Sequence, residues 1–525
     1  MYVDLTIKNY RCFGDSDPVR IPLRKGFHAL VGVNNSGKSS LLRFFFEFRA
    51  LFALLGSADG TFTHILQRNQ YSFGPSANIA DINELFSNFN DRNLEMQFLF
   101  SSEPGDAEQR NFRTDIVVAR GANTFQMKLF MDGQLFTGGF DPTSRNISAV
   151  GVSNVVANIG FVLDTFAALT NTLYVGPFRN AVNVGATANY FDIPIGQSFI
   201  ATWRGNKTGP VKKLHEATLQ LTEDIKRIFG FRQLEINATD DNKSMQLFID
   251  GKSYFLPELG SGLSHFVMVL ASAAFRKPAY ILIDEPEMGL HPSLQLDFLT
   301  TLGSYASEGV MFSTHVLGLA RASSERIYSV QRKDGISQVR PLEKTARLSE
   351  FLGELSFSGY QELGFDKILL VEGATDVKTF QQLLRKYGLD HKVVLLPLGG
   401  SQLINGTRDV ELQEMKRISQ NLFAVIDSER TSQGLELKPD RLAFAESCKR
   451  IGISCLVLDR RAIENYLTDR AVKQFKGNAF RALTPYELLG DAIPSWHKEE
   501  NWRIANEMTK EEIDLTELGA FLRAL

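Results

Sequence analysis

The chain has 525 residues, a formal net charge of −3 and three cysteines. One hydrophobic core rarely spans this length, so two or three domains are expected. The nearly balanced charge excludes a globally basic nucleic-acid-binding protein, and any such surface must be local. Cys12, Cys448 and Cys455 lack metal-site spacing and cannot all pair, which favours a reducing, cytoplasmic compartment. Polar residues close to Met1 and the absence of any run of about 18 apolar residues predict no secretory signal and no membrane partner.

The first 150 residues have the pattern of antiparallel sheet. Apolar and polar residues alternate within the first 30 residues and again at 95–100, 114–118 and 124–130, which predicts strands. A cluster of phenylalanines at 44–48 lies in a predicted helix, and we expect it to fill the core beneath that helix.

Later segments alternate between strands and helices. The intervals between Leu214, Leu221, Ile225 and Ile228 predict an amphipathic helix at 212–229. Further strands are predicted at 279–283, 310–312, 327–330, 367–371, 393–397, 422–426 and 453–458, and helices at 375–386 and 408–419. A helical connector is predicted from about 340 to 364. This alternation is typical of α/β cores, and it restarts near residue 365, where we expect a domain boundary.

A phosphate-binding loop is predicted at residues 32–39, where GVNNSGKS satisfies the pattern GxxxxGK[ST] between an apolar strand and a helix start. In such a loop, backbone N–H groups and the helix N-terminus bind phosphate. Lys38 would reach the outer phosphates and Ser39 would ligate Mg²⁺. The residues expected to bind ATP or GTP here are Asn34, Asn35, Ser36, Gly37, Lys38, Ser39 and Ser40.

Two carboxylates follow a buried strand in the same part of the chain. Asp284 and Glu285 come directly after the apolar run Ala279-Tyr280-Ile281-Leu282-Ile283. At the carboxyl end of such a strand, Asp284 can orient the Mg²⁺ shell and Glu285 can polarise water for attack on the γ-phosphate.

A Ser/Gly-rich segment precedes that strand, and a histidine ends the next one. The order of Ser261 and Gly262, the carboxylate pair and His315 resembles the ABC-type ATPases. The resemblance implies that Ser261 and Gly262 are signature residues and that His315 senses the γ-phosphate. Taken alone, the first segment also fits a helix N-cap and His315 a buried structural histidine. Because the signature of that family acts across a dimer, a homodimer or higher homo-oligomer is implied.

The segment Asp284-Glu285-Pro286-Glu287-Met288-Gly289-Leu290-His291-Pro292 resembles a narrower branch, which contains the OLD (overcoming lysogenization defect) nucleases and the RecF- and SMC-like repair ATPases. Arg11, in Asn9-Tyr10-Arg11-Cys12-Phe13, matches their opening pattern of a basic residue near a phenylalanine. The resemblance makes Arg11 a nucleotide contact, and the alternative is an ordinary surface arginine.

A second group of carboxylates lies beyond residue 365. Glu372 directly follows the strand 367–371, and Asp427 directly follows the strand 422–426. Parallel strands place their carboxyl ends on one rim of a sheet, so these side chains can converge. Oxygen ligands of this kind suit Mg²⁺ or Mn²⁺.

This second part resembles the Toprim domain of topoisomerases, primases and OLD nucleases, which pairs a strand-end glutamate with a later DxD motif. Here the motif is Asp427-x-Glu429, a departure that puts a full two-metal site in doubt. Asp376 matches the EGxxD form of OLD members, and residues 398–401 supply the glycine turn.

Two further site residues follow from the same resemblance. Glu464, in Glu464-Asn465-Tyr466-Leu467, is a candidate metal ligand or a helix-start glutamate. The catalytic lysine of the family has the candidates Lys498 and Lys510, while Arg503 stands in a similar context. Of the two, Lys498 is taken as the catalytic residue.

The fold class expected is therefore α/β: an ABC-type ATPase domain over 1–364, with a small helical dimerisation segment at about 150–230, and a Toprim nuclease domain over 365–525. The order of motifs along nearly the whole chain resembles the OLD family. This implies an ATP-regulated DNA endonuclease with Glu285, Glu372, Asp427, Glu429 and Lys498 as catalytic residues, and with ATP and Mg²⁺ or Mn²⁺ as cofactors. Retron- or Gabija-like anti-phage defence, with a partner protein or retron RNA and DNA, is implied by the resemblance alone.

Two alternatives remain open. The chain could be a non-nucleolytic, RecF- or SMC-like DNA-binding repair factor in which the Toprim half is degenerate. A topoisomerase or primase would need a catalytic-tyrosine domain or a zinc ribbon, and the sequence has neither.

Overall fold

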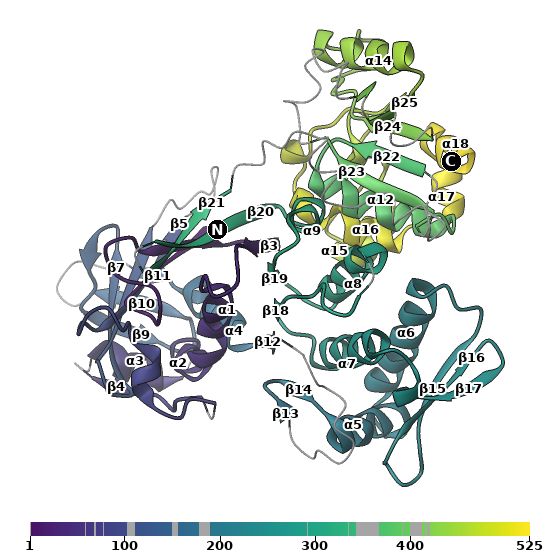
Figure 1. Ribbon diagram of the computed structural model, residues 1–525. Coiled ribbons are helices and arrows are strands. Elements are labelled where there is room, and N and C mark those ends of the chain that lie inside the picture. Colours follow the sequence, from purple (N-terminus) through teal and green to yellow (C-terminus); the bar gives the residue numbers. More distant parts are fainter. Residues whose placement is uncertain are drawn as a thin grey trace.

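The computed structural model describes two parts of the chain, an N-terminal part within 2–342 and a C-terminal part within 367–525 (Figure 1). The residues described are 2–57, 59–67, 70–76, 78–101, 111–149, 156–177, 189–290, 292–333, 335–342, 367–390, 392–398, 412–413, 415–416 and 421–525. None of the helices in these ranges is both long and apolar enough to cross a membrane.

A six-stranded sheet forms the centre of the N-terminal part. Its order is β12 (Thr172–Val175), β18 (Tyr280–Asp284), β19 (Gly309–Thr314), β3 (Gly26–Val31), β20 (Arg326–Lys333) and β21 (Ile336–Pro341). All neighbours are parallel except β20 and β21. The strands β18 and β19 are apolar on both faces because each face meets a core: Leu282 joins one hydrophobic cluster, whereas Ile281 and Ile283 join the other.

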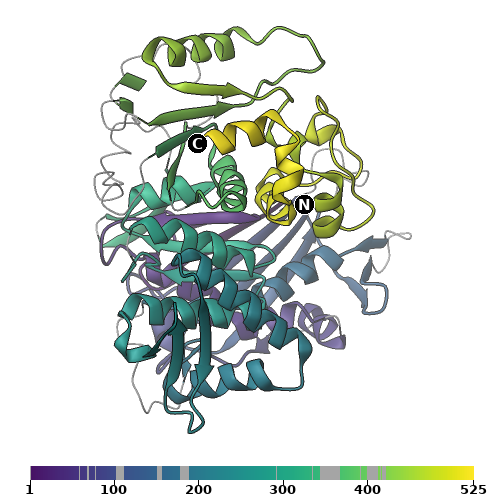
Figure 2. The same cartoon turned by 90° about the vertical axis from the view of Figure 1, so that its right-hand side faces the viewer.

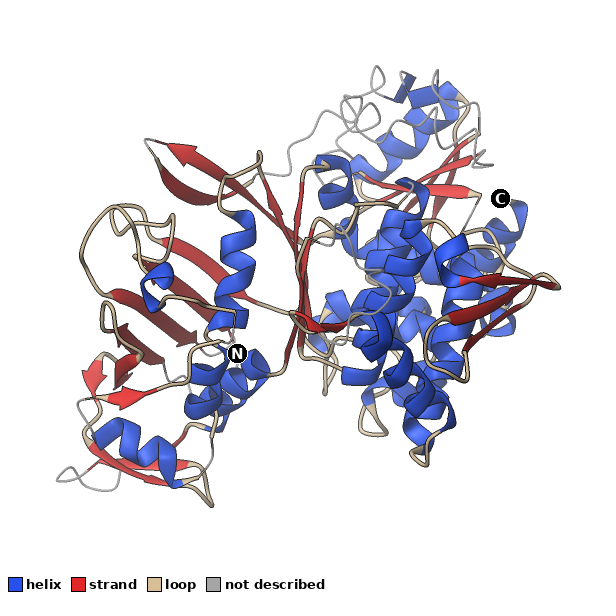
Figure 3. Ribbon diagram, turned by 60° about the horizontal axis from the view of Figure 1, so that its bottom comes forward, coloured by secondary structure: helices blue, strands red, loops and turns tan. Residues whose placement is uncertain are grey.

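An antiparallel lobe packs on one face of this sheet (Figure 3). Its strand order is β2 (Val19–Leu23), β1 (Tyr2–Lys8), β5 (Leu94–Ser101), β6 (Phe112–Val118), β7 (Thr124–Met131) and β4 (Tyr71–Ser72), and β8 (Gln134–Leu135) pairs with β7. Smaller strands are β9 (Gly138–Asp141), β10 (Asn146–Ala149) and β11 (Val156–Asn158). The helices of this lobe are α1 (Lys38–Glu47), α2 (Arg49–Leu55), α3 (Gly60–Gln67), η1 (Ile82–Leu85) and α4 (Gly160–Thr170).

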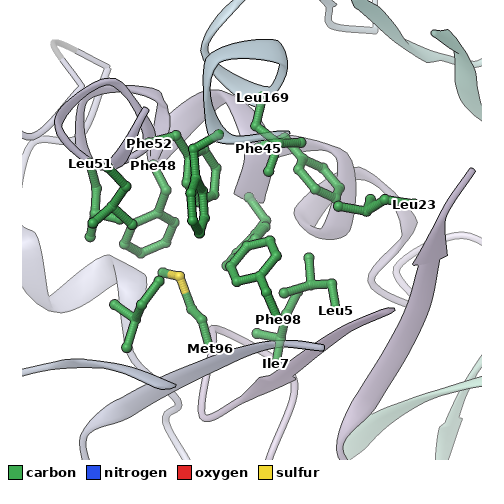
Figure 4. Packing of buried hydrophobic residues seen from close by; sticks show 14 of the residues in the cluster. Leu5, Ile7, Leu23, Phe45, Phe48, Leu51, Phe52, Met96, Phe98 and Leu169 are labelled. Atoms are coloured by element: carbon green, nitrogen blue, oxygen red, sulfur yellow. The ribbon is translucent and has the colours of Figure 1, made fainter. Parts of the chain in front are cut away.

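The phenylalanines of α1 and the residues after it fill the core of this lobe, as predicted. Phe44, Phe45, Phe46 and Phe48 are all buried. Figure 4 shows Phe45, Phe48 and Phe52 from the helices pointing toward side chains of β1 and β5, among them Leu5, Ile7, Met96 and Phe98. This packing holds α1, and with it the loop that precedes α1, against the sheet.

Helices cover the other face of the central sheet. They are α5 (Gly196–Thr208), α6 (Lys212–Ile228), α7 (Ser261–Arg276), α8 (Pro292–Ser304) and α9 (Leu317–Ser323), with β13 (Asn189–Tyr190), β14 (Ile193–Pro194), η2 (Leu256–Glu258) and a small sheet of β15 (Leu234–Ala238), β16 (Met245–Ile249) and β17 (Lys252–Phe255). The amphipathic helix predicted at 212–229 is α6. The segment 150–230 is not only helical, because its apolar residues 172–175 pair with β18 as β12, the edge strand of the central sheet.

The C-terminal part contains a four-stranded parallel sheet. Its order is β23 (Val393–Pro397), β22 (Lys367–Val371), β24 (Leu422–Ile426) and β25 (Ser454–Val457). The helices are α12 (Ala374–Lys386), α14 (Pro439–Ile451), η3 (Ile463–Tyr466), α15 (Asp469–Lys476), η4 (Leu489–Asp491), η5 (Lys498–Glu500), α16 (Asn501–Glu507), α17 (Lys510–Asp514) and α18 (Glu517–Ala524). The glycine turn at 399–400 and most of the helix predicted at 408–419 lie outside the described residues.

The predicted helical connector begins where the structure has a strand. Residues 343–366 lie outside the described ranges, and 336–341 form strand β21, so the prediction of helix from about 340 is wrong at its start. The segment 326–341 forms a hairpin because the turn at Gly335 returns the chain beside β20.

The two parts are packed closely on one another, with the C-terminal part stacked on helices of the N-terminal part (Figure 2). Trp502 of α16 belongs to the hydrophobic cluster of the central sheet, and its ring lies 6.4 Å from that of Phe27. Arg503 donates to the carbonyl oxygens of Gly303 and Ala306 at the end of α8. The N-terminal and C-terminal parts therefore share a core contact.

A buried ion pair crosses this contact, and its disruption should destabilise the protein. The ammonium of Lys378 on α12 pairs with Glu325, and the side chains are 0% and 8% exposed. Glu325 also accepts from the amide of Phe27 at 2.5 Å. Lys378→Met leaves an unpaired buried carboxylate, so we expect a loss of about 3–5 kcal/mol in the free energy of unfolding. Measured by urea unfolding, the double variant with Glu325→Gln should recover most of this loss. If Lys378→Met is as stable as the parent protein, the ion pair does not contribute to stability and the prediction is wrong.

The buried histidine of β3 predicts acid sensitivity. Burial lowers the pKa of His28 from 6.5 to about 4. Because the unfolded chain then binds the proton more readily, stability present above pH 6.5 is lost as the pH falls toward 4, by up to about 3 kcal/mol. We expect His28→Phe to flatten the unfolding free energy over this pH range. The exposed His64→Gln should leave the dependence unchanged, and equal curves for both variants would refute the prediction.

Candidate functional site

The phosphate loop lies between β3 and α1, as predicted. Gly37 has φ of 109°, and a Cβ atom there would lie 2.8 Å from Cys12 Sγ, so only glycine fits the last turn of the loop. Lys38 folds back over the loop and donates to the carbonyl oxygens of Gly32 and Val33 at 2.8 and 3.0 Å. Burial lowers the pKa of Lys38, and Glu285 and Asp284 oppose that shift.

A pocket of about 910 Å³ opens at this loop. Nine residues predicted to bind the nucleotide line it, together with Glu285, the residue predicted to polarise water. The nine are Arg11, Asn34, Asn35, Ser36, Gly37, Lys38, Ser39, Ser40 and Asp284. Much of the remaining wall comes from Asp81, Asn83, Glu84, Asn88, Phe89 and Arg332. The volume is within the range of small-molecule sites. This second wall was not predicted, because its residues come from segments far from the loop in the chain.

The acidic side of the pocket has one oxygen that suits a cation. Asp284 is 4% exposed, and its Oδ1 accepts from the hydroxyl of Ser313. The other oxygen, Oδ2, is buried without a hydrogen-bond partner. Buried acceptors of this kind are rarely left unpaired, so Oδ2, with the hydroxyl of Ser39 in the same pocket, fits a Mg²⁺ ligand.

Glu285 and His315 are directly paired. His315 Nε2 lies 2.8 Å from Glu285 Oε1. The backbone of Glu285 has φ of 51°, and its amide donates to the carbonyl oxygen of Ser313 at 3.1 Å. His315 does not line the pocket itself, but it contacts the carboxylate predicted to act on water.

Glu287 accepts hydrogen bonds from Thr314 and His315 and so fixes the position of His315. It was not predicted as a site residue. Its Oε1 accepts from the hydroxyl of Thr314 at 2.7 Å and from the amide of His315 at 3.0 Å. Burial raises the pKa of Glu287. Its place two residues after Glu285, in DEPE, is the only sequence signal for this role.

The predicted signature residues lie away from this pocket. Ser261 and Gly262 begin α7, which covers the other face of the central sheet from α1 (Figure 1). Gly262 packs so closely on Gly289 that a Cβ atom would lie 2.2 Å from the carbonyl oxygen of Gly289. Gly262 is not among the described residues that line the pocket of its own chain.

Arg11 lines the pocket, and its side chain is held in place by Glu47 and Tyr10. Its guanidinium pairs with Glu47 of α1 and donates from Nε to the hydroxyl of Tyr10 at 3.1 Å. Tyr10 in turn donates to Glu47 at 2.7 Å. Arg11 is therefore a fixed cation facing the phosphate loop.

In the C-terminal part, three predicted ligands surround one lysine. Lys498 Nζ lies 3.8 Å from each of Asp376 Oδ1, Asp427 Oδ2 and Glu464 Oε2. All three carboxylates are buried, and burial raises the pKa of Asp376 and of Asp427. The nearby carboxylate of Asp376 is the main cause of a raised pKa at Lys498.

Of the basic candidates, only Lys498 contacts these carboxylates among the described residues. Lys510 pairs with Asp514 at 3.2 Å, and Arg503 is bound to α8. Among the described residues, no three His, Cys, Asp or Glu side chains lie close enough together to enclose a metal ion. However, Asp376 Oδ1 and Glu464 Oε2 are buried without a hydrogen-bond partner, and such hard oxygens fit Mg²⁺ or Mn²⁺.

The other two predicted ligands lie against an arginine. Arg441 of α14 donates to both carboxylate oxygens of Glu372 at 2.8 Å and to Glu429 Oε1 at 2.8 Å. The ammonium of Lys438 also pairs with Glu429. The structure thus divides the five predicted acidic ligands into a group of three around Lys498 and a group of two around Arg441.

No protein-family model matches the chain. Solved structures similar to it include SMC head domains. The head domain from Thermotoga maritima has 13% identity and a TM-score of 0.33, over 65% of this chain and 98% of that one. The Smc head domain with an extended coiled coil bound to the C-terminal domain of ScpA, from Pyrococcus furiosus, has 14% sequence identity and a TM-score of 0.35. The match covers 65% of this chain and 96% of that one. The Smc head domain with a coiled coil and joint, from Pyrococcus yayanosii, has 11% sequence identity and a TM-score of 0.35. The match covers 68% of this chain and 100% of that one.

Proposed function

We propose that the N-terminal part is an ATP hydrolase. The observation that carries this is one pocket containing the Lys38 ammonium, the unpartnered oxygen of Asp284, and Glu285 paired with His315. Lys38 and the loop amides bind the phosphates, while Ser39 and Asp284 hold Mg²⁺, which would neutralise phosphate charge. Glu285 orients the attacking water, and His315 fixes the Glu285 carboxylate.

The ATPase proposal includes a homodimer. Ser261 and Gly262 lie on the opposite face of the sheet from the pocket of their own chain, so in an ABC-type arrangement a second copy must supply them.

The C-terminal part, in this proposal, is a metal-dependent DNA nuclease whose cleavage is controlled by the ATPase. Support comes from Asp376, Asp427 and Glu464, whose carboxylates surround Lys498 at the carboxyl edge of the sheet. When bound, a divalent cation would activate water and stabilise the leaving oxygen. Lys498 supplies positive charge for the phosphodiester. A role in anti-phage defence, with a partner protein or retron RNA and DNA, extends the proposal through the OLD resemblance.

A non-nucleolytic, SMC- or RecF-like DNA-binding ATPase is the second candidate. It is favoured by the hydrogen bonds that Arg441 donates to Glu372 and Glu429. Glu372 is the glutamate that follows β22, and Glu429 is the residue that replaces the second aspartate of the DxD motif. In this alternative the C-terminal part binds DNA without cutting it.

Supercoiled plasmid incubated with the chain and Mg²⁺ or Mn²⁺ separates the two candidates. The nuclease proposal expects nicked or linear DNA that requires the metal and is absent with chelator. Plasmid that stays intact with either metal, with and without ATP, while a gel-shift assay detects binding, would support the second candidate instead.

A further inference from the structure

Phe27, near the start of β3, contacts both parts of the chain. Its side chain is buried, and its ring lies 6.4 Å from the ring of Trp502 on α16. The ammonium of Lys378 on α12 lies 4.1 Å from the centre of the same ring. A Cβ atom on Gly303 would lie 2.3 Å from Phe27 Cζ, so this glycine of α8 leaves the space that the ring fills. The ring of Phe27 is therefore enclosed by α8, α12 and α16.

The backbone of Phe27 is held by the same contact. Its amide donates to Glu325 Oε2 at 2.5 Å, and its carbonyl oxygen accepts from the amide of Glu325 at 3.0 Å. Glu325 also pairs with the buried ammonium of Lys378. Separating a buried charge from its partner is costly, and a cation held over a ring is attracted more strongly where water is excluded. Phe27, Glu325 and Lys378 therefore form one tightly held unit.

Helix α12 connects this unit to the Lys498 group. Lys378 lies two residues after Asp376 in the helix. Positions two apart in an α-helix point to nearly opposite sides, so Lys378 faces Phe27 while Asp376 faces Lys498. The two atoms of the second contact, Asp376 Oδ1 and Lys498 Nζ, lie 3.8 Å apart. A shift of α12 at Lys378 thus also shifts Asp376.

The segment that carries Lys498 is attached to the same region. Lys498 begins η5, Glu500 ends it, and α16 with Trp502 follows directly. The buried carboxylate of Glu500 pairs with Lys25, which directly precedes β3, at 3.6 Å and with Lys476 of α15 at 3.0 Å. The turn that carries Lys498 is therefore fixed between the start of β3 and α15.

Strand β3 connects this region to the nucleotide pocket. It runs from Gly26 to Val31, and the phosphate loop begins at the next residue. Its neighbours β19 and β20 pair with it on either side within the central sheet. Rigid secondary elements of this kind can carry coupling between distant sites. A displacement of β3 at the phosphate loop would therefore also displace Phe27.

We propose that Phe27 is a positioning residue for the Lys498 group. Its ring sets the position of α12 against η5 and α16, which keeps Asp376 beside Lys498, and it passes a displacement of β3 on nucleotide binding to both. This inference rests on the nucleotide control proposed above and names the residue through which that control acts. If Phe27 only filled the shared core, its loss would have the same effect as the loss of another buried phenylalanine.

Amide hydrogen exchange of the full-length chain, measured by mass spectrometry with and without the ATP analogue AMP-PNP and Mg²⁺, tests the inference. In the parent, the analogue should change the exchange rates of α12 and of residues 498–507 by about twofold or more. Phe27→Leu should abolish this change while it binds the analogue within about threefold of the parental affinity. Without the analogue, Phe27→Leu should speed exchange in the same two segments by about threefold or more, but not in β18.

Phe199→Leu is the matched control for Phe27→Leu. Phe199 is buried in the same hydrophobic cluster, and its ring lies 6.2 Å from that of Trp203, within the N-terminal part. This variant should keep the change caused by the analogue. Trp502→Leu removes the other ring of the contact and should abolish the change as Phe27→Leu does, so it replaces Phe27→Leu if thermal unfolding shows that variant to be unfolded.

Three results would each overturn the inference: a parent in which the analogue leaves both segments unchanged, a folded Phe27→Leu or Trp502→Leu that keeps the change, or a Phe199→Leu that loses it. The exchange result does not depend on DNA cleavage. The expected exchange pattern on a chain that leaves plasmid intact would refute the nuclease proposal alone. Nicking that responds to ATP equally in the parent and in Phe27→Leu would refute this inference alone.

Discussion

Asp427→Ala is expected to reduce DNA cleavage on the order of 100-fold or more. Asp427 directly follows β24, is 8% exposed, and lies 3.8 Å from Lys498. Its Oδ1 accepts a hydrogen bond from the amide of Ile463 at 3.1 Å. Alanine removes a carboxylate that both the metal and Lys498 need, and metal stabilisation of the transition state is worth several kcal/mol. The measurement is the initial rate of plasmid nicking at saturating Mn²⁺.

Two controls make the Asp427 result specific. Glu436→Gln removes an exposed carboxylate from the same part of the chain and should nick at the parental rate. ATP hydrolysis by Asp427→Ala should stay near that of the parent, because the residue lies outside the nucleotide pocket. Unchanged nicking in Asp427→Ala would remove the carboxylate group from the mechanism.

Lys38→Ala should lower ATP hydrolysis by a similar factor, on the order of 100-fold, and should also weaken ATP binding. The ammonium is held at the loop by Gly32 and Val33, where the outer phosphates would lie, so alanine removes a preorganised charge. Hydrolysis and binding of a fluorescent ATP analogue are the two readouts.

Glu285→Gln is the matched comparison for Lys38→Ala. It keeps the Lys38 ammonium and the loop, so binding should persist while hydrolysis is lost, because the amide cannot polarise water as the carboxylate does. If both variants bind ATP equally, the ammonium of Lys38 does not contact the phosphates and the assignment is wrong.

The parallel strands were predictable because they are buried on both faces and therefore read as uninterrupted apolar runs. The predicted strands 367–371, 393–397 and 422–426 coincide with β22, β23 and β24. The phosphate loop was recognisable for the same kind of reason, since its glycine spacing follows from local backbone geometry. The short strand β12 was missed because its three apolar residues, which follow α4 closely, do not differ in pattern from the end of a helix.

The partners of charged side chains could not be predicted from the sequence. Arg441 reads as an ordinary charged residue in a helix start, and only the placement of α14 beside the ends of β22 and β24 brings it to Glu372 and Glu429. Glu325 and Lys378 likewise meet only because α9 and α12 pack together. Such contacts form only when distant segments pack together, and no sequence motif links the segments concerned.

Control of cleavage by the nucleotide is the central claim, and one experiment tests it most directly. Plasmid nicking is measured at fixed Mn²⁺ for the parent and for Lys38→Ala, each with and without ATP. The account predicts that ATP changes the nicking rate of the parent, while Lys38→Ala nicks at one rate under both conditions. Equal rates in all four samples, or no nicking in any of them, would contradict it.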